Sequence, residues 1–189
     1  MFFCAKNIQA IGFRSLFLQA LKMYNKLRDL KGVNVMQRVT NAVYIHDSKI
    51  LMLKKPRRNW YVAPGGKMEL GESITRAVKR EYKEETGLSL LNPRLSSVFT
   101  FVMDEKEEWM MFTYVSHQAD GNVLDHTPEG VLEWISVNDV LRLPMAEGDR
   151  TIIKHAINHP EYVLTGTFYY TDDFNLQKQI IDDQKDLLV

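Results

Sequence analysis

The stretch SITRAVKREYKEETGL, residues 73–88, decides how the surrounding chain is understood. Its first residue is a good helix N-cap, and Gly87 suits the left-handed residue that often ends a helix, so a helix up to residue 86 is predicted. In that helix Glu81, Glu84 and Glu85 stand at positions i, i+3 and i+4. Their carboxylates therefore share one face, with side chains roughly 5–6 Å apart.

The charges of this helix are sorted in a way that an ordinary surface helix avoids. Three pairs four residues apart carry like charges: Arg76 with Arg80, Lys79 with Lys83, and Glu81 with Glu85. Two carboxylates about 5 Å apart repel by roughly 3 kcal/mol at an effective dielectric constant near 20. The alternative is a solvated helix, but the pattern favours recruitment of a cation. Carboxylates without nearby His or Cys favour Mg²⁺ or Mn²⁺.

The composition is that of a soluble globular protein with a sizeable core: 189 residues, 45% hydrophobic and 25% charged. A formal net charge of zero gives no support for a nucleic-acid or membrane-surface partner. No apolar run approaches the roughly 18 residues that a spanning helix needs. The one cysteine, Cys4, excludes an intramolecular disulfide, so a reducing, cytoplasmic location is predicted.

Residues 1–35 differ from the rest of the chain because they contain six Lys or Arg residues and one acidic residue. Apolar positions between the basic residues predict a basic amphipathic helix. Three explanations compete: a helix packed on the body, a mitochondrial-type targeting segment, or an upstream extension outside the working protein. Lys31-Gly32-Val33 can be encoded by a purine-rich series that resembles a bacterial ribosome-binding site, so we hypothesise that Met36 is the natural start. The predicted division is an extension, residues 1–35, and one domain, residues 36–189.

From residue 37 onward the apolar pattern is that of strands. RVTNAVYIHD and KILMLKK predict one hairpin, WYVAPGGK a short strand entering a Pro-Gly-Gly loop, and SSVFTFVM with WMMFTYVS a second hairpin. GVLEWISV predicts a strand, VNDVLRL a helical turn, DRTIIKHAINH a helix, and YVLTGTFYYT a late strand before an amphipathic polar tail. Strands in irregular order around one long helix predict an α+β or α/β fold, a sandwich with a mixed sheet.

Residues 66–88 read GKMELGESITRAVKREYKEETGL and resemble the Nudix box, G-x5-E-x7-R-E-U-x-E-E-x-G-U, where U is an apolar residue. All eight defining positions match: Gly66, Glu72, Arg80, Glu81, Glu84, Glu85, Gly87 and Leu88. The one departure is Tyr82, where an aliphatic residue is more usual. The resemblance implies a loop-helix-loop clamped into a β/α/β sandwich, a divalent cation, and hydrolysis of a nucleoside diphosphate linked to another group.

The resemblance also implies roles for single residues. The metal ligands would be Glu81, Glu84 and Glu85, with the backbone carbonyl of Gly65 as a further ligand. Arg80 would orient a glutamate, and Glu72 would lie behind the metal ligands or steady the loop. The bound metal would neutralise phosphate charge and lower the pKa of an attacking water, and one of the glutamates would act as general base.

A carboxylate from a later loop often completes such a site. Glu129, in TPEGVLEW, is the best candidate, and the alternative is a solvent-exposed turn residue. Glu133 is the next candidate, and the alternative is an outward-facing strand position.

The sequence beyond the box bears on the substrate. Branches of the family that hydrolyse ADP-ribose or dinucleoside polyphosphates carry a proline or a tyrosine downstream, and neither occurs in the window VMDEKEE. WYVAPGGK, LPMAEGDR and LTGTFYYTDDF resemble parts of oxidised-purine nucleoside triphosphatases, in which an acidic pair reads the altered base. Glu147 and Asp149 fall in about that place, and the alternative is two loop carboxylates near a helix N-terminus.

Other side chains offer contacts for the base or the phosphates. Aromatic faces for stacking are offered by Trp60, Phe99, Phe101, Trp109 and Phe112, although most such strand positions belong to a core. Lys67 and the KKPRR group, residues 54–58, are candidates for the phosphates, although a basic hairpin loop is usually just solvated.

These observations predict a monodomain, Mg²⁺-dependent enzyme that cleaves a nucleoside triphosphate to the monophosphate and pyrophosphate. The leading substrate is 8-oxo-dGTP or a similar damaged nucleotide. One alternative is a nucleotide sugar or another nucleoside diphosphate derivative; another is a non-catalytic nucleotide sensor, which the intact carboxylates disfavour. The predicted partner is a nucleotide, with no nucleic acid and no membrane, and the protein is a monomer or a homodimer.

Overall fold

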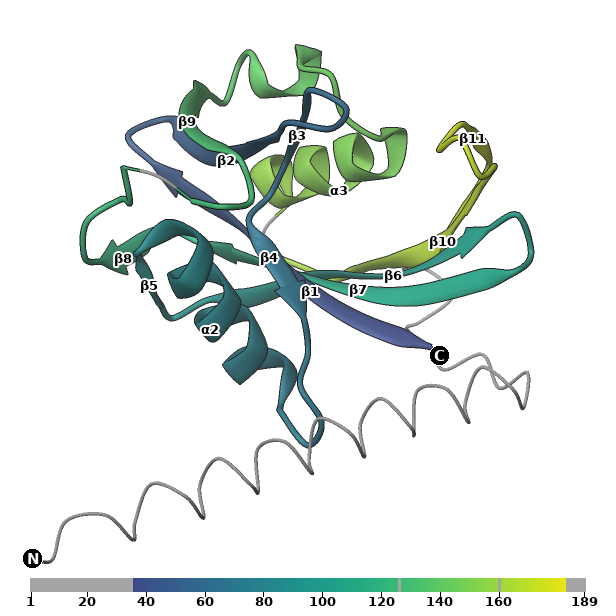
Figure 1. The fold of residues 1–189 in the computed structure, drawn as a ribbon, viewed down its shortest axis with the longest axis horizontal. Helices are drawn as coiled ribbons and strands as arrows, with labels where there is room; N and C mark the ends of the chain where they lie inside the picture. Colours follow the sequence, from purple (N-terminus) through teal and green to yellow (C-terminus); the bar gives the residue numbers. More distant parts are fainter. Residues whose placement is uncertain (1–35, 126, 160, 183–189) are drawn as a thin grey trace, which may run out of the picture. The chain divides into compact units, whose positions relative to one another are not determined.

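The computed structural model describes residues 36–125, 127–159 and 161–182 (Figure 1). The predictions for residues 1–35 lie outside this part of the chain. None of the helices within it is long and apolar enough to cross a membrane. The strands are β1 (Gln37–His46), β2 (Lys49–Lys55), β3 (Trp60–Val62), β4 (Gly65–Lys67), β5 (Ser89–Leu91), β6 (Arg94–Met103), β7 (Glu107–Ser116), β8 (Gln118–Asp120), β9 (Val131–Ser136), β10 (Leu164–Tyr170) and β11 (Leu176–Ile181). The helices are α2 (Ile74–Thr86), the short 3-10 helix η1 (Val140–Arg142) and α3 (Glu147–Asn158).

Nine of the described strands form one mixed sheet. Its order is β11-β10-β6-β7-β1-β2-β3, with β4 added to β1 and β9 added to β2, while β5 and β8 pair separately. The hairpins β1–β2 and β6–β7 are antiparallel, as predicted, whereas β1–β7 and β6–β10 are parallel pairs that need longer connections. The prediction of a mixed-sheet sandwich is confirmed.

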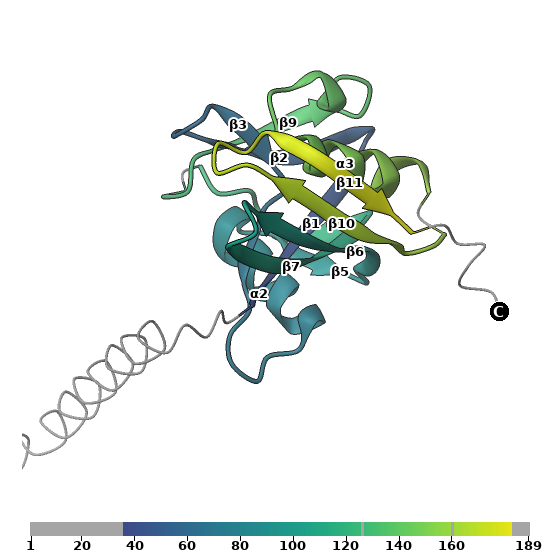
Figure 2. The same ribbon diagram turned by 90° about the vertical axis from the view of Figure 1, so that its right-hand side faces the viewer.

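The helices α2 and α3 lie on opposite faces of the sheet (Figures 1 and 2). Successive strand residues point to opposite faces, so β1 contributes to two cores. Ala42 and Tyr44 pack with Tyr82 of α2, whereas Val43 packs with Ile153 of α3. The sheet therefore holds both helices in place by burying apolar side chains on each side of the same strand.

Helix α2 begins and ends where the sequence predicts. The Ser73 hydroxyl accepts a hydrogen bond from the Arg76 N–H at 3.3 Å, and Gly87 has a φ of 81°. A Cβ at Gly87 would lie 2.4 Å from the carbonyl oxygen of Asn122, so the helix end also needs the room that glycine leaves. Both ends of the helix that carries the three glutamates are thereby fixed.

The structure adds four strands that the sequence analysis did not predict, β4, β5, β8 and β11, of which β5 and β8 pair with each other. The Pro-Gly-Gly loop contains β4, because Gly65 pairs with Asn41 and Lys67 with Val39 of β1. The tail after the late strand forms β11, which adds antiparallel to β10. The partner of β4 lies more than twenty residues away along the chain, and β11 is a polar segment that becomes a strand by pairing with its neighbour β10.

Candidate active site

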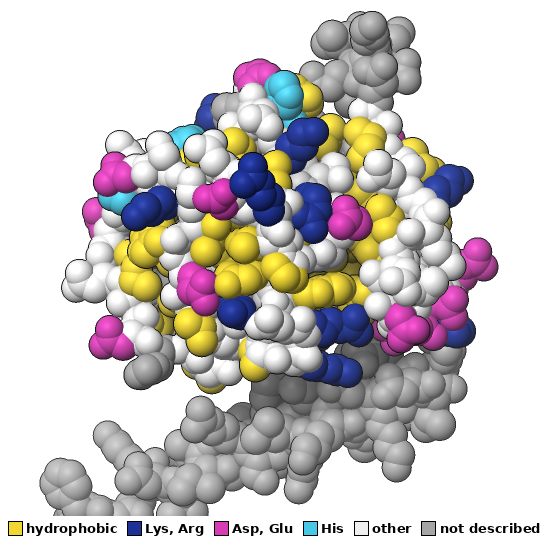
Figure 3. Space-filling view, turned by 90° about the horizontal axis from the view of Figure 1, so that it is seen from above, with side chains coloured by type: hydrophobic (Ala, Val, Ile, Leu, Met, Phe, Trp, Pro, Cys, Tyr) yellow, Lys and Arg dark blue, Asp and Glu magenta, His cyan; other side chains and the backbone are white. Residues whose placement is uncertain are grey.

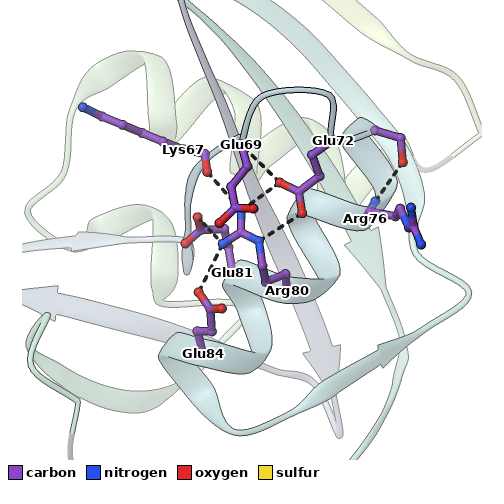
Figure 4. Close-up of polar contacts among 8 residues, drawn as sticks. Lys67, Glu69, Glu72, Arg76, Arg80, Glu81 and Glu84 are labelled. Carbon is purple, nitrogen blue, oxygen red and sulfur yellow. Dashed lines mark hydrogen bonds and ion pairs between the residues drawn. The ribbon is translucent and has the colours of Figure 1, made fainter. Parts of the chain in front are cut away.

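Arg80 is the centre of the polar network around the loop before α2 and the first turns of that helix (Figure 4). Its guanidinium donates to both carboxylate oxygens of Glu72, at 3.0 and 2.8 Å. Nη1 also donates to Glu81 at 2.8 Å and to Glu84 at 3.1 Å, and Nη2 donates to the carbonyl oxygen of Lys67 at 3.2 Å. One arginine therefore holds three carboxylates and the loop backbone together.

This network decides the charge of Glu72. The hydrogen bonds from Arg80, with a further one from the Glu69 N–H at 3.0 Å, lower the pKa of Glu72 to about 2. The same contacts raise the pKa of Arg80 above its ordinary value. The Glu72–Arg80 pair thus stays ionised at neutral pH, and it ties the loop to the helix.

Two adjacent glycines let β4 approach the glutamates of α2. The Gly65 N–H donates to Oε2 of Glu85 at 2.7 Å. At Gly66, a Cβ would lie 2.3 Å from Oε2 of Glu81, so the carboxylate of Glu81 rests directly over that glycine. The glycines at these two positions therefore bring backbone within contact of two carboxylates, which a larger residue would prevent.

Glu85 differs from the other glutamates of the helix because its side chain is buried. Burial raises the pKa of Glu85, and the Gly65 N–H and the Lys55 ammonium oppose that shift. Lys55, at the end of β2, places Nζ 3.7 Å from Oε1 of Glu85 and 2.8 Å from Oε2 of Glu129. Glu129, predicted from sequence as a carboxylate from a later loop, therefore shares one ammonium group with Glu85.

Glu133, the second candidate for that later carboxylate, is engaged elsewhere. It belongs to β9, and its Oε2 accepts a hydrogen bond from the Tyr61 hydroxyl at 2.8 Å. The loop that carries Glu129 passes very close to β2. A Cβ at Gly130 would lie only 2.2 Å from the carbonyl oxygen of Lys54. The fold thus brings Glu129, and not Glu133, to the helix carboxylates.

An aromatic region lies on the α3 side of the sheet. Trp60, half-buried on β3, meets Phe174 edge to face at a ring-centroid distance of 6.0 Å. The Arg58 guanidinium lies over both rings, at 5.1 and 4.6 Å from their centroids. Viewed from above, hydrophobic side chains gather near the middle of the molecule with Lys and Arg beside them (Figure 3).

The other aromatic candidates divide as the strand pattern suggested. Phe99 and Phe101 are buried in the core with Phe168 and Tyr170, whereas Trp109 and Phe112 are half-buried. Among these candidates for stacking, Trp60 is half-buried and lies beside the Arg58 guanidinium. The sequence did not single out Phe174, because its place beside Trp60 depends on the turn between β10 and β11.

The predicted acidic pair, Glu147 and Asp149, lies in the first turn of α3, and the two side chains have different surroundings. Glu147 is exposed and lies 3.3 Å from the Arg150 guanidinium. Asp149 is half-buried, and burial raises its pKa from 3.8 to about 6. Between them, the Gly148 N–H donates to the Tyr170 hydroxyl at 2.7 Å, which joins the start of α3 to the aromatic region.

Asn41 was not among the predicted residues, although it lies beside Gly65 in the β1–β4 pairing. Its side chain is largely buried, its Nδ2 contacts the Met111 sulfur at 3.3 Å, and its Oδ1 has no hydrogen-bond partner among the described residues. The available signal was an asparagine directly before the apolar run Ala42 to Ile45, and a buried amide without strong partners is unusual.

In the part of the chain that the structure describes, no three His, Cys, Asp or Glu side chains are already gathered around a common point that would hold a metal ion. The glutamates of α2 instead pair with cationic side chains of the protein. Arg80 engages Glu81 and Glu84, and Lys55 lies at Glu85 and Glu129. The donor set nevertheless consists of hard oxygens, the type that Mg²⁺ and Mn²⁺ prefer.

Comparison with known proteins gives four informative matches. The NUDIX domain family matches residues 36–156. An uncharacterised Nudix hydrolase, YvcI of Bacillus subtilis, is 48% identical over 153 residues, which cover 79% of this chain and 96% of that protein. The crystal structure of a mutator MutT protein from Bacillus halodurans is 49% identical, with a TM-score of 0.73 over 78% of this chain and 98% of that one. A more distant relative, the 8-oxo-dGDP phosphatase NUDT18 of Mus musculus, is 33% identical over 88 residues, which are 44% of this chain and 26% of that protein.

Proposed function

The chain belongs to the Nudix hydrolase family and acts on phosphoanhydride bonds, and from that premise we propose that it hydrolyses a nucleoside triphosphate to the monophosphate and pyrophosphate. The proposed substrate is 8-oxo-dGTP or a similar oxidised nucleotide. The observation that carries this proposal is the position of the Gly65–Gly66 backbone against Glu85 and Glu81. There the Gly65 N–H donates to Glu85, and the Glu81 carboxylate rests over Gly66.

Members of the family are typically dependent on a divalent metal, and the oxygens gathered here fit Mg²⁺ or Mn²⁺. Glu81, Glu84, Glu85 and Glu129 would hold it together with the carbonyl of Gly65. A bound cation at this place neutralises phosphate charge and acidifies an attacking water.

The other roles belong to the chain's own side chains. Arg80 keeps Glu81 and Glu84 on the substrate side of α2 through the hydrogen bonds that it donates to both. Glu72 fixes Arg80, and one of the helix glutamates takes the proton of the attacking water. Lys67, exposed beside Gly66, is placed to meet phosphate oxygens.

The base is proposed to lie on the α3 side of the sheet, against Trp60. A half-buried indole beside an arginine offers a stacking face for a purine. Asp149 is the proposed reader of the base edge, because its side chain is half-buried at the start of α3 and burial raises the pKa of its carboxyl group. Glu147, turned toward Arg150, would act less directly. The similarity to the 8-oxo-dGDP phosphatase NUDT18 supports an oxidised purine.

The test is a panel of nucleotides incubated with the full chain and Mg²⁺, with pyrophosphate and phosphate measured separately. The panel contains dGTP, 8-oxo-dGTP, 8-oxo-dGDP, ADP-ribose and sugar nucleotides. We expect pyrophosphate from 8-oxo-dGTP at the highest kcat/KM. Turnover of sugar nucleotides alone would replace the proposed substrate with the alternative class, and tight binding without turnover would support a nucleotide sensor.

We propose a small nucleotide as the partner of the enzyme, a cytoplasmic location, and a monomer or homodimer as its assembly. Size-exclusion chromatography with light scattering measures the assembly directly.

A further inference from the structure

Lys55 occupies an unusual place for a lysine at the end of a strand. Its ammonium nitrogen lies within 3.7 Å of a carboxylate oxygen of Glu85 and 2.8 Å from one of Glu129. The two glutamates come from different elements, one from α2 and one from the loop before β9. A single positive charge therefore bridges two carboxylates that the sequence separates by more than forty residues.

The surroundings of Glu85 distinguish this contact from a surface ion pair. The Glu85 side chain is 10% exposed, and its second oxygen is already occupied by the Gly65 N–H at 2.7 Å. Burial and the nearby charge of Glu129 both disfavour its ionised form, whereas Lys55 favours it. Without a cation at this point, a buried carboxylate would face a second carboxylate with nothing to offset the repulsion.

We infer that the Lys55 ammonium holds the place of a divalent cation between Glu85 and Glu129 and leaves that place when the cation binds. This inference rests on the proposed function, since it takes both glutamates as cation ligands. Lys55 and a divalent cation repel each other and compete for the same two oxygens, so they do not share the position. The freed ammonium would then be available to the negatively charged phosphates of the substrate.

The chemistry of lysine suits this exchange. Its charge sits at the end of a flexible four-carbon stem, so the head group can move several ångströms without a change in β2. An arginine would fork onto both carboxylates and release them less readily. Cation binding and phosphate binding are thereby coupled through one side chain, because Lys55 becomes available to the substrate only after the cation has displaced it.

The neighbouring lysine provides a matched control. Lys54 precedes Lys55 on β2, so its side chain points to the opposite face of the strand. Its ammonium lies 5.4 Å from the centroid of the Tyr61 ring and has no carboxylate partner of α2 in the described structure. Lys54 and Lys55 therefore have the same charge and length and lie on the same strand, but their ammonium groups lie in different surroundings.

The test measures Mn²⁺ binding to the full chain without nucleotide, by the loss of the electron paramagnetic resonance signal of free Mn²⁺. We expect Lys55→Met to bind Mn²⁺ about tenfold more tightly than the wild type, because a competing positive charge has been removed. Lys55→Arg is expected to gain no affinity, and Lys54→Met to match the wild type. With Mn²⁺ saturating, Lys55→Met is expected to raise KM for the nucleotide about tenfold.

A second pair of variants isolates the bridge. In a Glu129→Gln background, Lys55→Met should bring a much smaller gain in Mn²⁺ affinity, because one of the two competed oxygens has lost its charge. Equal or weaker Mn²⁺ binding by Lys55→Met, with a melting temperature like that of the wild type, overturns the inference. Because the titration contains no substrate, its outcome is separate from the nucleotide panel, whose failure would overturn only the proposed reaction.

Discussion

The two ends of the candidate site are built in opposite ways. The carboxylate end comes from one continuous stretch, residues 66–88, in which the loop, Arg80 and the glutamates contact one another. The aromatic end collects Trp60 from β3, Asp149 from α3 and Phe174 from the turn before β11. A local motif can thus carry the phosphate chemistry, whereas the proposed choice of base depends on the packing of distant elements.

The electrostatics of the two ends differ in the same way. At the carboxylate end, hydrogen bonds from Arg80 lower the pKa of Glu72 to about 2. At the aromatic end, burial raises the pKa of Asp149 to about 6. One carboxylate is thus held ionised by a partner, and the other is disfavoured in its ionised form by desolvation.

Neutralising a helix glutamate should have the largest effect on activity. Glu84→Gln and Glu85→Gln are each expected to lower kcat by about 10²–10⁴-fold, because each removes a charge from the cation-binding and proton-accepting set. Steady-state kinetics with Mg²⁺ and thermal unfolding are the measurements. Little loss of folding is expected, and the exposed Glu105→Gln serves as a control. Full activity in Glu84→Gln or Glu85→Gln would refute the assignment of the carboxylate end.

Substitutions at the two adjacent glycines should have different effects, one on the stability of the protein and the other on its catalytic rate. Gly65→Ala would place a Cβ 2.1 Å from the Thr40 carbonyl oxygen at a φ of +154°, so we expect roughly 3 kcal/mol or more of lost stability. At Gly66 the three atoms nearest to an added Cβ all belong to the carboxylate of Glu81, a side chain that can move aside. We expect Gly66→Ala to lower kcat by about 10–100-fold with an unchanged melting temperature. Chemical denaturation and kinetics distinguish the two, and equal stability of both variants would contradict the close approach at Gly65.

At the aromatic end the expected effect is on binding. Trp60→Ala should raise KM by about tenfold with kcat little changed, because stacking of one base on an aromatic ring contributes about 1–3 kcal/mol. Trp60→Phe should retain most of the affinity. The measurement is a KM and kcat series on 8-oxo-dGTP. A fall in kcat at constant KM would move Trp60 out of the base-binding role.

The smallest effect is expected for Asp149 and concerns stability as a function of pH. The folded pKa of about 6 exceeds the ordinary 3.8, so the native state holds a proton that the unfolded state has lost between these values. Wild-type stability should therefore fall as the pH rises from about 4 to about 6, and Asp149→Asn should remove that fall. At pH 7.5 we expect the variant to be more stable by about 1–3 kcal/mol, with no difference near pH 3.5.

Thermal unfolding from pH 3.5 to 8 measures this dependence. The same variant is expected to lose discrimination between 8-oxo-dGTP and dGTP, which a competition assay reports. Identical pH curves for Asp149→Asn and the wild type would show that Asp149 is solvated, and the contrast with Glu72 would disappear.

Much of the fold could be predicted from local pattern. The two hairpins and the limits of α2 were foreseen, because alternation, a serine N-cap and a C-terminal glycine act over a few residues. The strands β4 and β11 were not foreseen. The short segment Gly65–Lys67 and the polar tail become strands only through pairing with β1 and β10. Propensity is weakest where the partner strand makes the decision.

The sequence alone was enough for the helix of the carboxylate end and for the glutamates on one of its faces, because a helix converts their spacing directly into geometry. The approach of Gly65 and Gly66 to those glutamates depends on the pairing of β4 with β1. The packing of distant elements decides that Glu129 and not Glu133 reaches Glu85, that Lys55 bridges Glu85 and Glu129, and that Asp149 is half-buried while Glu147 is exposed. The physical reason is that burial and charge neutralisation depend on groups brought together from distant parts of the chain, and strand pairing, which a linear pattern does not contain, sets those neighbours.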